Sequence, residues 1–123
     1  MTLSDVSNIT GLNWKTVKDI DKHYIKERLV KLKEITPRRL GVDEVAYEKG
    51  HKYLTVVRDL DLQRVIWIGV GRKKETLDCF FTLLGEKKQR MITVVVLDMW
   101  DPYITSIHEF CPTADIVFDK FHI

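Results

Sequence analysis

Three strand-like segments follow one another between residues 39 and 70, and the links between them are too short to hold a helix. The segments are RLGVDEVAY (39–47), HKYLTVVRD (51–59) and RVIWIGV (64–70), all rich in β-branched and aromatic residues. A turn, EKG, joins the first pair, and the loop DLDLQ joins the second. Because parallel strands need a crossover of about a dozen residues, these links predict an antiparallel meander.

After residue 70 the pattern alternates between helix and strand. One apolar stripe predicts a helix over 73–84, closed by Gly85, and a second helix is expected from Pro102 to about Cys111. Met91 to Leu97 is expected to be a fourth strand, buried between two layers, and 114–119 a fifth. The sequence therefore predicts an α/β fold: a mixed sheet of three antiparallel strands, then two parallel strands added by crossover helices. This is the opening of a ribonuclease-H-like sheet, in which the first and fourth strands lie side by side.

The composition is that of one globular domain, with 45% hydrophobic and 31% charged residues in a chain of 123. No apolar run approaches the roughly 20 residues that a membrane span needs. The N-terminus lacks the basic and then apolar pattern of a secretion signal. Cys79 and Cys111 both fall in apolar helical patterns, so we expect two reduced core thiols in a cytoplasmic protein.

Charge is distributed unevenly along the chain. Residues 14–39 hold nine Lys or Arg residues and four acids, whereas residues 40–123 hold eleven bases and thirteen acids. A basic head on a mildly acidic body fits a segment that binds a polyanion. A solvated helix with many lysines gives the same distribution, so charge alone does not decide between the two interpretations.

Residues 1–36 are interpreted as a helix-turn-helix segment. A short helix and a turn that ends at Gly11 precede a second helix, from Trp14 to about Leu32. The second helix would lie in the major groove of DNA and contact phosphates. Its expected DNA-binding residues, which lie largely away from its apolar face, are Lys15, Thr16, Lys18 and Lys22. An ordinary helical hairpin gives the same pattern.

Two acids occupy positions where strand residues are expected to be apolar. Asp43 lies in the middle of the first strand, where Asp is depleted, and Asp98 directly follows the apolar run VVVL. If those strands are neighbours, ~4.8 Å apart, the two carboxylates repel each other unless a cation lies between them. Oxygen-only ligands suit Mg²⁺ or Mn²⁺, and a pair of such metals supports phosphodiester cleavage or transfer. A solvent-facing Asp43 and a plain turn role for Asp98 stay open.

Other acids have simpler interpretations. Asp101 is expected to cap the helix that Pro102 starts. Asp119 closes the fifth strand much as Asp98 closes the fourth, so it is either a turn residue or a third ligand. Glu44 follows Asp43 and therefore points to the opposite face of the strand, which disfavours it as a metal contact.

Several motifs, in their order and spacing, resemble one family. GVDE stands at the first strand, GRKKETL enters the first helix, LDMWDPY follows the fourth strand, and VFDKFH follows the fifth. Over residues 38–123 the chain resembles the bacterial insertion-sequence transposases of the ISL-three group. The stretch LSDVSNITGLNWKTVKDI resembles the helix-turn-helix that precedes the catalytic domain in that group.

The resemblance implies a ribonuclease-H-like core whose DDE triad binds two divalent metals, cuts DNA at transposon ends and joins those ends to a target. Asp43 matches the first Asp of the triad and Asp98 the second. The third acid, a Glu, lies in that group on a helix well beyond the position of residue 123. We therefore expect residues 37–123 to be the N-terminal portion of the catalytic domain, in a truncated transposase that is inactive alone.

A non-catalytic interpretation stays open beside this one. The chain could be a DNA-binding module that competes with a full-length transposase for transposon ends. In either case the expected partner is DNA, with a full-length transposase or a second copy of the chain as further candidates, in the cytoplasm of a bacterium and without a membrane.

Overall fold

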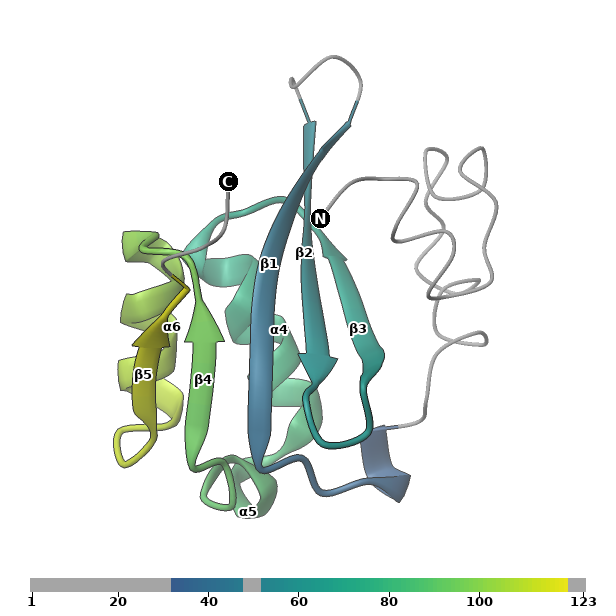
Figure 1. Cartoon of the computed structure of the whole chain (residues 1–123), viewed down its shortest axis with the longest axis vertical. Coiled ribbons are helices and arrows are strands. Elements are labelled where there is room, and N and C mark those ends of the chain that lie inside the picture. Colours follow the sequence, from purple (N-terminus) through teal and green to yellow (C-terminus); the bar gives the residue numbers. More distant parts are fainter. Residues whose placement is uncertain (1–31, 48–51, 120–123) are drawn as a thin grey trace.

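The computed structural model describes residues 32–47 and 52–119 (Figure 1). Almost all of the predicted helix-turn-helix segment, including its four expected DNA-binding residues, lies outside these ranges. The described part opens with a short 3₁₀ helix, η1 (Leu32–Glu34). The chain then enters the sheet at Arg39, two residues after Pro37.

The antiparallel meander is confirmed. It consists of β1 (Arg39–Tyr47), β2 (Lys52–Asp59) and β3 (Arg64–Val70), and each strand pairs antiparallel with the next. Asp59 closes the turn after β2, because its Oδ1 accepts hydrogen bonds from the backbone N–H groups of Asp61 (2.9 Å) and Leu62 (3.1 Å). This side-chain contact with the backbone lets the chain reverse within the short loop that the sequence predicted.

The second half adds two strands through helical crossovers. Its elements are α4 (Lys74–Leu84), α5 (Glu86–Gln89), β4 (Val94–Leu97), α6 (Asp101–Phe110) and β5 (Asp115–Phe118). The strand order is β3-β2-β1-β4-β5, and β4 pairs parallel with both β1 and β5. The fold is therefore α/β with a mixed five-stranded sheet, consistent with a ribonuclease-H-like domain, and the first and fourth strands are neighbours as predicted.

The core lies between one face of the sheet and the helices. In Figure 1, α4 and α6 both lie behind the strands. The rings of Phe80 and Phe81 pack edge to face with their centroids 5.3 Å apart, and Phe81 stacks on Phe110 at 5.5 Å. The predicted stripe of α4 is confirmed, because its buried residues are Leu77, Phe80, Phe81 and Leu84. Gly85 ends this helix with φ +91°, a backbone conformation that favours glycine.

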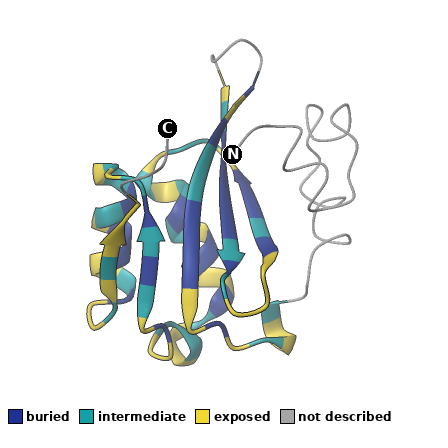
Figure 2. Cartoon of the chain, in the orientation of Figure 1, coloured by how far each residue is buried: buried dark blue, intermediate teal, exposed yellow. Residues whose placement is uncertain are grey.

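Two expectations about the fourth strand need correction. It begins at Val94 rather than Met91, because α5 and a turn occupy the residues before it. It is not enclosed by two layers within the described residues, since Val94 and Val96 are half-buried while Val95 and Leu97 are fully buried. Figure 2 shows that burial decreases further in β5, where exposed residues predominate.

Two single-residue expectations also fail. Asp101 is the first residue of α6 and does not cap it: the N-cap position belongs to Trp100, which makes no side-chain capping hydrogen bond. Cys79 is exposed, because it lies on α4 beside the apolar stripe rather than within it; Cys111 is buried as expected.

Candidate functional site

Three aspartates stand at one level of the sheet, on its three parallel neighbours. Val42 of β1 is paired with Leu97 of β4, and Leu97 with Phe118 of β5. The next residue on each strand is an aspartate: Asp43, Asp98 and Asp119. The backbone N–H of Asp119 donates to the carbonyl of Leu97 at 2.9 Å, so the pairing of β4 with β5 continues to this level. We name Asp43, Asp98 and Asp119 the aspartate row.

The row brings the two predicted metal ligands to adjacent positions. Parallel neighbours are ~4.8 Å apart, and Asp43 and Asp98 are both half-buried. Since Val42 packs in the core against the helices, strand alternation directs Asp43 toward the opposite face. Adjacent, half-buried carboxylates are a suitable donor set for a hard divalent cation such as Mg²⁺ or Mn²⁺. Their role as metal ligands stays a prediction.

The described residues do not supply a complete three-ligand cluster. Among residues 32–47 and 52–119, no group of three or more His, Cys, Asp or Glu side chains is placed so that it could hold a metal ion. Asp119 stands two strands away from Asp43, on the far side of β4. The predicted donor set within these ranges stays the pair of carboxylates at Asp43 and Asp98.

Glu44 belongs to a different set of contacts from its neighbour Asp43. Its Oε2 lies 3.6 Å from Nη1 of Arg72, in the link between β3 and α4. The guanidinium of Arg72 lies over two rings, with its Cζ 3.9 Å from the ring centroid of Tyr53 and 4.7 Å from that of Trp100. We name Tyr53, Arg72 and Trp100 the arginine stack.

A buried pair of hydroxyl groups, those of Thr55 and Tyr103, binds the backbone of the residue that precedes Arg72. Thr55 on β2 is fully buried, and its hydroxyl donates to the carbonyl of Gly71 at 2.7 Å. The same oxygen lies 2.7 Å from the Tyr103 hydroxyl, which donates the second bond because a threonine hydroxyl carries one proton. Burial raises the pKa of Tyr103 to about 12, so this donor stays protonated at neutral pH.

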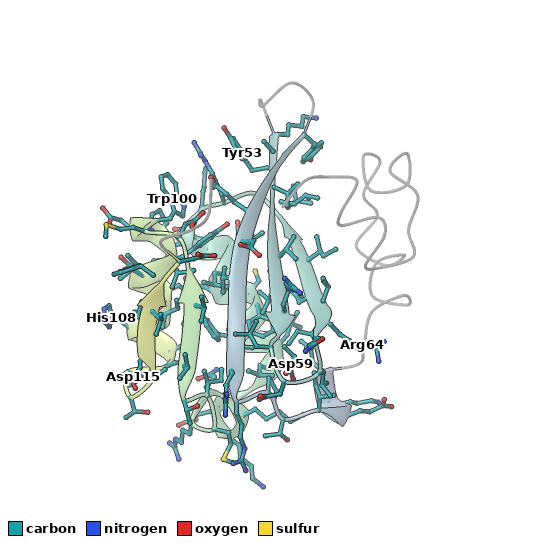
Figure 3. All side chains as sticks on the ribbon, in the orientation of Figure 1. Tyr53, Asp59, Arg64, Trp100, His108 and Asp115 are labelled. Carbon is teal, nitrogen blue, oxygen red and sulfur yellow. The ribbon has the colours of Figure 1, made fainter. Side chains whose placement is uncertain are left out.

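Trp100 connects the aspartate row with the arginine stack. It stands two residues after Asp98, and its indole N–H donates to the carbonyl of Arg72 at 2.8 Å. Figure 3 shows Tyr53 and Trp100 at one end of the sheet, and Asp115 and His108 toward the other. The side chains near Tyr53 and Trp100 border a groove of about 900 Å³, lined by residues from the β1–β2 end, from 70–76 and from the start of α6.

Sequence reasoning missed the arginine stack. The pattern marked GRKKETL as a family motif, but it gave no sign that Arg72 would lie between two rings that come from distant segments. Thr55 and Tyr103 are ordinary residues for a strand and a helix, and their hydroxyl contact spans 48 positions in the sequence. The available signal was a polar residue at an inward position of an otherwise apolar strand, which Thr55 supplies.

Residues 40–123 match the DDE family of the ISL-three group, which is described as "Transposase". The chain belongs to this transposase family. It is 37% identical over 118 residues to the transposase for insertion sequence element IS1001 of Bordetella parapertussis, a match that covers 96% of this chain and 29% of that relative.

A second relative supports the same family assignment. The chain is 42% identical over 86 residues to the transposase for insertion sequence element IS1557 of Mycobacterium tuberculosis, which covers 70% of this chain and 19% of that protein. The chain thus spans less than a third of the length of either relative. Within the described residues of this chain, no helix is long and apolar enough to cross a membrane.

Proposed function

We propose that this chain carries part of a metal-dependent site for DNA cleavage and strand transfer, in which Asp43 and Asp98 bind Mg²⁺ or Mn²⁺. The observation that carries the proposal is their placement: they directly follow the paired residues Val42 and Leu97 on neighbouring parallel strands. Membership of the transposase family supports the same assignment. A divalent metal bound there would activate a water or a 3′-hydroxyl and stabilise the leaving oxygen.

The two carboxylates would have distinct structural support. Asp43 lies inside β1, a strand that is paired on both sides. Asp98 lies just past the end of β4, in a short link that the Trp100 indole attaches to the carbonyl of Arg72. A ligand pair with one member on a central strand and one on a restrained link is held in place before any metal binds, which lowers the cost of ordering the site.

We further propose that the 123-residue chain does not transfer strands by itself. The family resemblance implies three acids, whereas residues 32–47 and 52–119 offer no group of three metal-binding side chains and would hold a metal with two carboxylates. Loss of one member of a group that acts as a unit removes most of its activity. The chain would then act in DNA binding through its basic head, with Lys15, Thr16, Lys18 and Lys22 on phosphates, as the competitor of a longer transposase or as part of an assembly.

Metal titration followed by thermal unfolding tests the ligand assignment. A ligand that binds the folded state raises the melting temperature in proportion to the logarithm of its concentration. We expect Asp43→Asn and Asp98→Asn each to weaken Mn²⁺ and Mg²⁺ binding roughly tenfold or more, because even residues that support a ligand indirectly contribute 10–100-fold to affinity. Asp115→Asn is the matched control: Asp115 is exposed and begins β5, at the opposite end from the aspartate row.

The same titration shows how the proposal fails. If the wild-type chain binds neither metal, or if Asp43→Asn and Asp98→Asn match Asp115→Asn, the two carboxylates are not a metal pair. Strand-transfer activity of the isolated chain in Mn²⁺ would overturn the inactivity proposal alone, since it would require a third ligand from within these 123 residues.

A further inference from the structure

The groove beside the arginine stack has the chemistry of a phosphate-binding surface. Four of its lining residues are basic, two are acidic and three are aromatic. The basic residues are Lys52, Arg72, Lys73 and Lys74, and the acidic ones are Glu75 and Asp101. Basic side chains beside aromatic walls suit the backbone of a nucleic acid, because cations contact phosphates while rings stack on bases.

The basic residues of the groove are not equivalent. The ammonium of Lys74 lies 2.8 Å from Asp78 and 2.7 Å from Glu109, so two carboxylates already neutralise it. Lys73 is exposed at the N-terminal end of α4. Arg72 is the residue that the structure holds in one orientation, because its guanidinium is fixed between Tyr53 and Trp100.

The arginine stack is built for a bidentate acceptor. The planar guanidinium presents its N–H donors in one fork, a geometry that matches the oxygens of a phosphate, and the rings of Tyr53 and Trp100 restrict its rotation. Its partner Glu44 is 3.6 Å away, beyond hydrogen-bond distance, and its Oε2 has no hydrogen-bond partner among the described residues. The Arg72 side chain is 37% exposed. The guanidinium is thus oriented by Glu44 without being enclosed.

We propose that Arg72, with Lys73 beside it, binds a backbone phosphate of the DNA that the aspartate row acts on. The inference rests on the proposed function, because it takes the ligand to be DNA. Trp100, two residues after Asp98, packs against the Arg72 guanidinium, and its indole N–H donates a hydrogen bond to the Arg72 carbonyl. A phosphate held by Arg72 would therefore lie in fixed relation to the link that carries Asp98, and would set the position of the DNA along the sheet.

The test measures binding of a short fluorescein-labelled duplex by anisotropy over a series of salt concentrations, in EDTA. The protein is the full chain with Lys15, Lys18 and Lys22 changed to Ala, which removes the expected contribution of the basic head. Arg72→Gln should weaken binding roughly tenfold or more, as expected for loss of a charged hydrogen bond. It should also lower the slope of log affinity against log salt by about 1, the contribution of one phosphate contact.

Arg90→Gln is the matched control, because Arg90 is an exposed arginine after α5 whose partner is Glu86. In the arginine stack, Arg72→Lys keeps the charge but loses the planar fork, so we expect an affinity between those of wild type and Arg72→Gln. If Arg72→Gln leaves the salt slope equal to that of Arg90→Gln, Arg72 has a structural role only and the proposal is wrong.

A second variant keeps the test decisive if Arg72→Gln does not fold. Lys73 is exposed, so Lys73→Gln should leave the melting temperature unchanged and still lower the salt slope by about 1. An unchanged slope for Lys73→Gln would then overturn the proposal. Because these measurements are made without metal, their failure is separate from a failure of the metal titration of Asp43 and Asp98.

Discussion

Replacing Thr55 with Val should lower the free energy of unfolding by about 2–4 kcal/mol, although the two side chains have nearly the same shape. Thr55 is fully buried, and its hydroxyl bonds both the Gly71 carbonyl and the Tyr103 hydroxyl, each at 2.7 Å. Valine leaves both of those groups without this partner. A buried polar group that loses its partner costs about 1–3 kcal/mol, and the added apolar burial of valine offsets a part of the sum.

Urea unfolding followed by tryptophan fluorescence measures this loss. For a domain of this size, the expected change corresponds to a fall in melting temperature on the order of 15 °C. Thr82→Val is the matched control, because its hydroxyl also donates to a carbonyl, that of Asp78 at 2.9 Å, but it lies on the exposed side of α4. Water can replace that bond, so we expect a change within about 0.5 kcal/mol.

A double-mutant cycle identifies the contact that is responsible. Tyr103→Phe alone should cost about 1–2 kcal/mol. Combined with Thr55→Val it should cost about 1 kcal/mol less than the sum of the single changes, because with both hydroxyls removed only the Gly71 carbonyl lacks its partner. The reasoning is refuted if Thr55→Val costs no more than Thr82→Val, or if the two changes are additive.

Two further predictions concern the backbone and the pH dependence of stability. Gly85→Ala should destabilise the fold by about 1–3 kcal/mol through backbone strain, because Gly85 has φ +91° and ψ 154°. A steric clash is not the cause, since a Cβ there would meet no atom within 4 Å. Urea unfolding measures the loss with Glu86→Ala as the control, and equal stabilities of the two variants would contradict the prediction. Burial raises the pKa of Cys111 from its ordinary 9.0 to about 12, and that of Tyr103 from 10.0 to about 12. The unfolded chain therefore releases these protons first, so the free energy of unfolding should be insensitive to both groups below pH 9 and should fall from there to about pH 12; Cys111→Ala should delay the onset of that fall, and an unchanged onset would contradict the assignment.

The sheet could be predicted because its signals are local. The three strands of the meander are separated by links that exclude a helix, and the stripe of α4 recurs at helical spacing, so each element was fixed by its own residues. The pairing of β1 with β4 followed from the order of elements. Local signals failed at the start of β4, which depends on the preceding element. The apolar residues before Val94 indicated a strand, but α5 and the turn after it precede β4 there.

The sequence predicted the carboxylates on one face of β1 but not the arginine stack on the other face. Asp43 and Asp98 were identifiable because a carboxylate is unusual inside or at the end of an apolar strand. The register that places them side by side came from the structure. The arginine stack had no comparable signal, since Tyr53, Arg72 and Trp100 lie far apart in the sequence. Their contact depends on how β2 and two links meet in space, which spacing in the sequence does not encode.

Consecutive residues of β1 join the two halves of the site. Strand alternation sends Asp43 to the face of the aspartate row and Glu44 to the side of Arg72. The link after β4 also connects the two halves, because Trp100 lies two residues after Asp98 and its indole N–H donates to the Arg72 carbonyl. Each of the segments 43–44 and 98–100 thus holds one residue of the proposed metal pair and one residue that contacts Arg72. A shift of either segment would change both together, so the geometry favours DNA positioning and metal binding as coupled properties of one site.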